Sequence, residues 1–88
     1  MPEQTLRDLI GQLRTEIDQL PPADEAARDR LTQLIADLEA RLSEPAEAAD
    51  HDNLVGSVQE SIRQLEVEHP RTTGVLNHIM MTLSNMGI

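Results

Sequence analysis

The chain has 88 residues, which suits one small domain, and it contains no Phe, Tyr, Trp or Cys. Its core must therefore be built from aliphatic side chains and Met, and disulfide or thiolate chemistry is excluded. The formal net charge is −9 at pH 7 and Lys is absent, which excludes the clustered cations that binding to nucleic acid or to anionic membranes requires.

The opening residues, "MPEQTLRDLI", lack the basic segment and the continuous apolar run of a secretory signal. No apolar run approaches the roughly 20 residues of a membrane-spanning helix. We therefore expect a cytoplasmic protein that binds neither nucleic acid nor membranes.

Residues 2–43 are predicted to form an antiparallel hairpin of two helices. Apolar side chains recur at spacings of three and four, which is typical of one stripe along a helix. Pro2 suits a helix start, the "LPP" segment ends the first helix, and Asp24 can cap the second. The two stripes consist of Leu6, Leu9, Ile10, Leu13, Ile17, Leu20, Ala27, Leu31, Leu34, Ile35, Leu38 and Leu42.

Residues 43–52, "SEPAEAADHD", are small and acidic without apolar periodicity, which predicts a linker. A third helix is predicted from about Asn53 to Glu68, with Asp52 or Asn53 as its N-cap. Pro70, followed by Thr and Gly residues, predicts a break near residues 69–73 rather than one long kinked helix. The third stripe consists of Leu54, Val55, Val58, Ile62, Leu65 and His69.

The fourth helix is predicted from Pro70 or Thr73 to Asn85, with Gly87 as a C-terminal stop, so that residues 53–86 form a second hairpin. Residues 72–88 contain no charged side chain, whereas a helix that packs on one side normally carries charge on the other. This helix is either the central helix of the monomer or one that packs on its own hairpins and on a second subunit.

Interfaces deplete charge at their centre and favour Met, and a small aliphatic core gains stability from self-association, so we favour a homodimer. Binding to another protein is the alternative. Changing Leu83 or Met80 to Asp is expected to abolish the contact. The predicted interaction surface consists of Leu76, Ile79, Met80, Leu83 and Met86.

No catalytic constellation is evident, and we expect a non-enzymatic protein without cofactor or metal. The nearest metal signal, Glu66-x-x-His69, occurs once, whereas di-iron bundles repeat it on two helices. We interpret His69 as a cap at the end of the third helix, "DHD" at residues 50–52 as a solvated turn, and His78 as a polar residue on the buried helix. The alternatives are a small-ligand or metal-binding bundle that uses His69 and His78, and an acidic decoy for a basic DNA-binding protein.

The segments "MPEQTLRDLIGQLRTEI", "LPPADEAARDRL" and "HPRTTGVLNHIMMTLSNMGI" resemble a family of small acidic helical proteobacterial proteins known as a domain of unknown function. The similarity spans nearly the full chain, and "LSNMGI" is its most specific part. The resemblance implies a bacterial, cytoplasmic protein without an established activity. The sequence as a whole predicts an all-α interaction or structural module, built as one four-helix bundle or as a dimer of such bundles.

Overall fold

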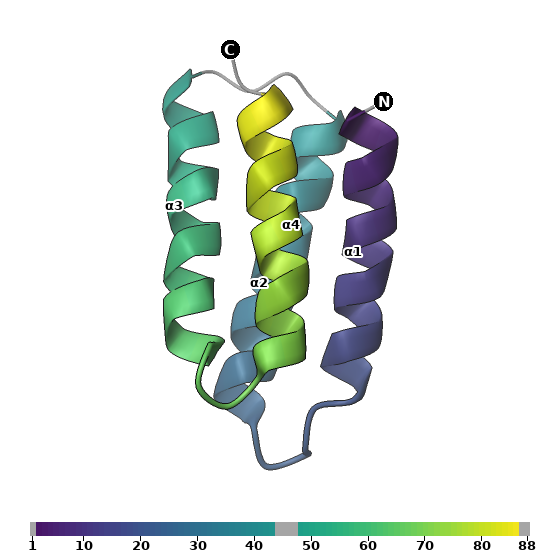
Figure 1. The fold of residues 1–88 in the computed structure, drawn as a ribbon, viewed down its shortest axis with the longest axis vertical. Coiled ribbons are helices and arrows are strands. Elements are labelled where there is room, and N and C mark those ends of the chain that lie inside the picture. Colours follow the sequence, from purple (N-terminus) through teal and green to yellow (C-terminus); the bar gives the residue numbers. More distant parts are fainter. Residues whose placement is uncertain (1, 44–47, 87–88) are drawn as a thin grey trace.

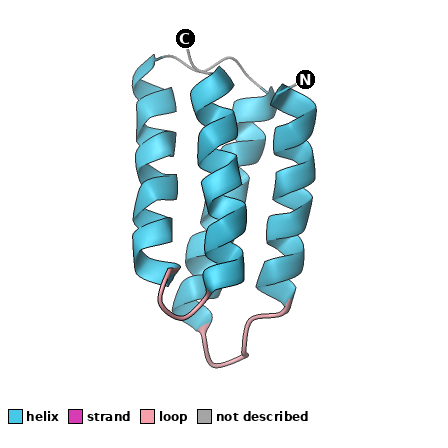
Figure 2. Cartoon of the chain, in the orientation of Figure 1, coloured by secondary structure: helices cyan, strands magenta, loops and turns pink. Residues whose placement is uncertain are grey.

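The chain folds into an up-and-down bundle of four α-helices in the computed structural model, which describes residues 2–43 and 48–86 (Figure 1). No strand occurs among the described residues (Figure 2). The predicted all-α class and four-helix bundle are therefore confirmed. The helices are α1 (Pro2–Asp18), α2 (Glu25–Ser43), α3 (Ala48–Leu65) and α4 (Pro70–Met86).

Each helix packs on two neighbours, in the order α1, α2, α3, α4 around the bundle. Helix α4 lies between α1 and α3 and packs on both more closely than α2 does, while α2 lies on the opposite side (Figure 1). Short connections make successive helices antiparallel, and α1 and α4 are antiparallel as well. None of the helices in the described residues is long and apolar enough to cross a membrane.

The predicted stripes meet in one aliphatic core. Leu side chains from α1, α2 and α4 are fully buried, and α3 contributes Val58. Burying an aliphatic side chain of this size contributes about 1.5–3 kcal/mol, so these residues supply most of the gain on folding. Leu42, Val55 and Ile62 pack against the core but remain partly exposed. The fully buried Leu residues are Leu6, Leu13, Leu31, Leu38, Leu76 and Leu83.

The predicted linker at residues 43–52 is wrong at both ends. Ser43 is the last residue of α2, and residues 48–52 already belong to α3. The "DHD" segment is therefore helical rather than a solvated turn, and Asp52 and Asn53 are not N-caps. Ala is the strongest helix former, which explains why this segment is helical without an apolar stripe. Residues 44–47 and Gly87, the predicted helix stop, lie outside the described residues.

The predicted break between the last two helices is confirmed, although α3 ends at Leu65 rather than Glu68. A turn over residues 66–69 follows, in which the His69 N–H donates to the Leu65 carbonyl oxygen over 2.8 Å. Pro70 is the first residue of α4. A backbone N–H at this position would have no acceptor within the helix, so proline loses no hydrogen bond there.

Helix α4 buries a wider arc than its apolar stripe suggests, because three Thr residues are buried beside the stripe. The Thr73 hydroxyl donates to the His69 carbonyl oxygen at 3.0 Å, and the Thr82 hydroxyl to that of His78 at 2.9 Å. These bonds satisfy the hydroxyl groups of Thr73 and Thr82, so both side chains can be buried at little cost. The buried threonines are Thr72, Thr73 and Thr82.

Candidate functional site

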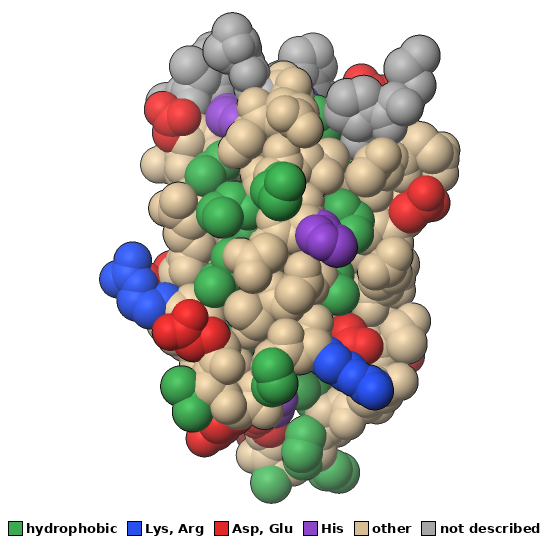
Figure 3. Space-filling view, viewed as in Figure 1, with side chains coloured by type: hydrophobic (Ala, Val, Ile, Leu, Met, Phe, Trp, Pro, Cys, Tyr) green, Lys and Arg blue, Asp and Glu red, His purple; other side chains and the backbone are tan. Residues whose placement is uncertain are grey.

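The outer side of α4 carries no charged side chain between residues 72 and 86. In Figure 3, the middle of this view is free of Lys, Arg, Asp and Glu, and charged groups lie to its sides and below it. Met81 is a large apolar residue on this side that is 63% exposed. We call this surface the α4 face. It consists of the exposed residues Gly74, Asn77, His78, Met81, Ser84 and Asn85.

The apolar part of the α4 face continues onto α3. When a right-handed helix is viewed from outside with its C-terminus up, its near side rises from left to right, and Figure 1 shows α4 in this orientation between α3 and α1. Met80 precedes the exposed Met81 and therefore lies on the α3 side, whereas Thr82 follows it and lies on the α1 side. On α3, Ser61 faces α2, where Arg30 donates to it, and helical spacing puts Val55 and Ile62 on the α4 side. Met80, Val55 and Ile62 are all partly buried and therefore partly accessible.

The predicted interaction residues divide between the core and the edge of the α4 face. Leu76, Ile79 and Leu83 are fully buried within the single chain, so no partner can contact them while the bundle is intact. Met80 and Met86 are partly exposed. The monomer's own core thus accounts for the apolar stripe of α4, but it does not account for the uncharged exposed side. Met81, which lies off the stripe, was not part of the predicted surface.

A side-chain contact joins the two interhelical connections at one end of the bundle. The Nε2 atom of His69 lies 2.7 Å from Oδ2 of Asp24, and these side chains are only 14% and 27% exposed. Asp24 occupies the N-cap position of α2, as predicted, since its carbonyl oxygen accepts from the Arg28 N–H at 3.2 Å. His69 occupies the same position before α4, so its side chain faces α2 instead of capping α3.

Glu68 completes a group of three possible metal ligands. One ligand atom each from Asp24, Glu68 and His69 lies within 4.8 Å of the other two. His78 belongs to a different region, because nine residues of helix separate it from His69 by about 13 Å. The fold therefore does not bring His69 and His78 together.

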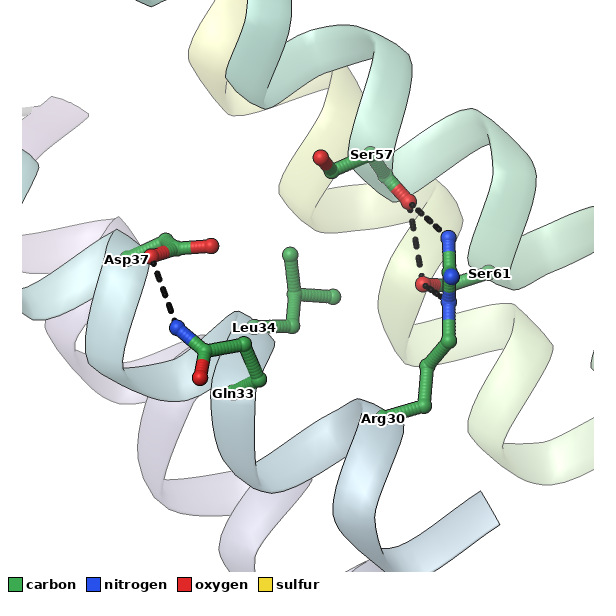
Figure 4. A pocket seen from close by; sticks show the side chains of 6 residues that line it. All are labelled: Arg30, Gln33, Leu34, Asp37, Ser57 and Ser61. Carbon is green, nitrogen blue, oxygen red and sulfur yellow. Dashed lines mark hydrogen bonds between the residues drawn. The ribbon is translucent and has the colours of Figure 1, made fainter. Parts of the chain in front are cut away.

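A small polar hollow lies between α2 and α3 (Figure 4). Arg30 reaches across it from α2, donating from Nε to the Ser61 hydroxyl oxygen at 3.0 Å and from Nη2 to the Ser57 carbonyl oxygen at 3.5 Å. The Ser61 hydroxyl also donates to the Ser57 carbonyl oxygen at 2.9 Å. Arg30 thus joins α2 to α3 through hydrogen bonds. These two helices pack less closely on each other than the other neighbouring pairs do. The hollow is lined by Arg30, Gln33, Leu34, Asp37, Ser57 and Ser61.

A family model described as "Domain of unknown function (DUF4404)" matches residues 6–88, and the chain belongs to this family. No curated protein and no solved structure was found to match the chain. The resemblance to a domain of unknown function is confirmed. Because the family description assigns no activity, the surface chemistry described above carries the functional argument.

Proposed function

We propose that this member of a family without an assigned function is a non-enzymatic interaction module that pairs with a second copy of itself through the α4 face. The observation that carries the proposal is the absence of charge from the exposed side of α4 in a chain with a net charge of −9. As in the prediction from the sequence, the proposed homodimer forms through the C-terminal helix. The contact lies on the exposed α4 face, however, rather than on the buried apolar stripe.

Charge favours this side of the molecule over the others. Two copies of a chain with this net charge repel each other, and the repulsion is strongest where acidic surfaces face each other. The α4 face itself contributes no carboxylate to such a contact. A basic partner, in contrast, would be attracted to the carboxylates on α1, α2 and α3 rather than to α4. The uncharged side therefore suits a second copy better than it suits a basic protein.

The side chains of the α4 face also suit an interface. Interface centres are depleted of charged residues and enriched in Met, and flexible Met side chains adapt to the opposing surface. Met81 is available for such a contact, and Met80, Val55 and Ile62 extend the apolar area toward α3. Helix α4 has 17 residues and is about 25 Å long, so a second α4 can lie antiparallel along it. That arrangement has twofold symmetry, the commonest in homodimers.

Light scattering coupled to size exclusion tests the proposal with two matched variants. Met81→Asp places a charge at the centre of the α4 face, while Val67→Asp places the same charge on an 86% exposed side chain in the α3–α4 connection. Because both positions are exposed, both variants should retain the helical content of the wild type in circular dichroism.

The expected mass is twice 9.8 kDa for the wild type and for Val67→Asp, and 9.8 kDa for Met81→Asp. Two equally dimeric variants would show that the contact lies elsewhere. Two equally monomeric variants would show that net charge, rather than the α4 face, controls association. Leu83→Asp is unsuitable for this purpose, because it would put a charge into the core and unfold the bundle.

A further inference from the structure

The cluster formed by Asp24, Glu68 and His69 is independent of the α4 face. Asp24 belongs to the α1–α2 connection, and the other two belong to the α3–α4 connection. Together they offer one imidazole nitrogen and two carboxylate oxygens, all within 4.8 Å of one another. Ligands brought together from two separate connections are set by the tertiary fold rather than by a local acidic run.

We propose that these three side chains bind a divalent transition-metal ion, with Zn²⁺ as the ion that fits the ligand set. Imidazole and carboxylate ligands together suit Zn²⁺, whereas Mg²⁺ and Ca²⁺ prefer oxygen ligands throughout. Three protein ligands leave one of the four tetrahedral positions of the ion for water or a further ligand.

The distances allow this coordination with small side-chain movements. Zn–N and Zn–O bonds are about 2.0–2.2 Å long, so two ligand atoms of a tetrahedral site lie about 3.4 Å apart. His69 Nε2 and Asp24 Oδ2 are 2.7 Å apart and need to separate slightly, with the ion replacing the proton between them. The exposed Glu68 side chain can rotate toward them without disturbing the core.

The local electrostatics also favour a cation. The N-termini of α2 and α4 both lie at this cluster, and each presents a partial positive charge of about half a unit. The two carboxylates carry two full negative charges, which outweigh the two partial charges. Around the cluster, Glu25 and Glu66 add negative charge. Arg28 and Arg71 add a similar positive charge, so the two ligand carboxylates decide the local sign.

An ion at this position would link the first hairpin to the second, where a hydrogen bond between the side chains of Asp24 and His69 already joins the two connections. Binding to the folded chain alone raises the thermal unfolding temperature in proportion to the logarithm of the free ion concentration once the site is filled. The site therefore predicts a stabilising effect that does not depend on any enzymatic activity.

Isothermal titration of the tag-free, chelator-treated protein with ZnCl₂ tests the site. We expect one Zn²⁺ per chain, a rise in the unfolding temperature, and movement of the His69 ring signals in NMR, with those of His78 unchanged. Glu68→Gln is the decisive variant, because it removes one ligand without touching the bond between His69 and Asp24. Loss of second-shell partners costs metal sites about 10–100-fold in affinity, so loss of a ligand should cost at least about tenfold.

Glu66→Gln is the matched control, since it removes the same charge from an exposed side chain two residues away. It should leave the Zn²⁺ affinity within about twofold of the wild type, because charges exposed to solvent interact weakly. The proposal is overturned if no saturable binding occurs, if Glu66→Gln and Glu68→Gln weaken binding equally, or if the signals of His51 or His78 move instead of those of His69.

Discussion

The contact between Asp24 and His69 should contribute measurably to stability, because it is short and largely shielded from water. The two atoms are 2.7 Å apart, and the side chains are 27% and 14% exposed. A hydrogen bond to a charged group contributes about 1.5–3 kcal/mol. Since Asp24 retains some contact with water, we expect a coupling energy near the lower limit, about 1.5 kcal/mol.

The chain contains a natural control at the surface. Arg14 Nη2 and Glu39 Oε2 join α1 to α2 over a nearly equal distance of 2.6 Å, but their side chains are 54% and 52% exposed. Exposed ion pairs typically contribute 0.2–1 kcal/mol in double-mutant cycles, that is, roughly a third of the value expected at His69. Burial, rather than distance, should therefore separate the two pairs.

Double-mutant cycles measure both couplings with alanine at each position. The single change Asp24→Ala also alters the residue before α2, but the cycle subtracts any such separate effect from the coupling. Unfolding in urea should be followed by far-UV circular dichroism, since the chain has no Trp or Tyr, and a chelator should be present to keep metal ions away. A coupling at Asp24–His69 no larger than that at Arg14–Glu39 would show that burial does not strengthen this contact.

Two further predictions concern the interior of the helices. Gly11→Ala and Gly56→Ala should each raise the free energy of unfolding by about 0.5–1 kcal/mol, because both positions are helical and exposed and an added Cβ would meet no atom within 4 Å. A fall in the urea midpoint of either variant would contradict this. Leu83→Ala should lower the free energy of unfolding by about 2–5 kcal/mol, because Leu83 is fully buried. A loss below about 1 kcal/mol in urea unfolding would show that α4 is not packed as described.

The helices and the core could be predicted from the sequence because both follow from local periodicity. Leu6, Leu13 and Leu31 recur on stripes that each helix must bury, and the structure buries them fully. The start of α4 at Pro70 could also be predicted locally, because proline is favoured at the first position of a helix. The helical residues 48–52 were missed, because they are helical without an apolar stripe and only their Ala content favoured a helix.

Contacts between distant segments could not be predicted in this way. Asp24 and His69 are 45 positions apart and meet because the two connections lie at the same end of the bundle. Their shared position before a helix was a usable signal, since hairpins of similar length bring their connections together. Arg30 and Ser61 likewise meet across helices. Ser61 is buried, but because its side chain is polar, the apolar pattern of the sequence did not predict this burial.

The interaction surface illustrates a further limit of periodicity. The apolar stripe of α4 led to the prediction that Leu76, Ile79 and Leu83 contact a partner, but these residues are buried in the core of the single chain. The informative signal was the missing charge on the opposite side, where Met81 is exposed. A helix whose exposed side lacks charge needs an explanation beyond its own core.

The absolute mass of the wild-type protein in solution, measured by light scattering over a range of concentrations, tests self-association most directly. Refractive-index detection is needed, because a chain without Trp or Tyr hardly absorbs in the near ultraviolet. We expect a mass of twice 9.8 kDa that persists in about 1 M salt, where exposed charges are screened beyond about 3 Å. A mass of 9.8 kDa at every concentration would contradict self-association through the α4 face.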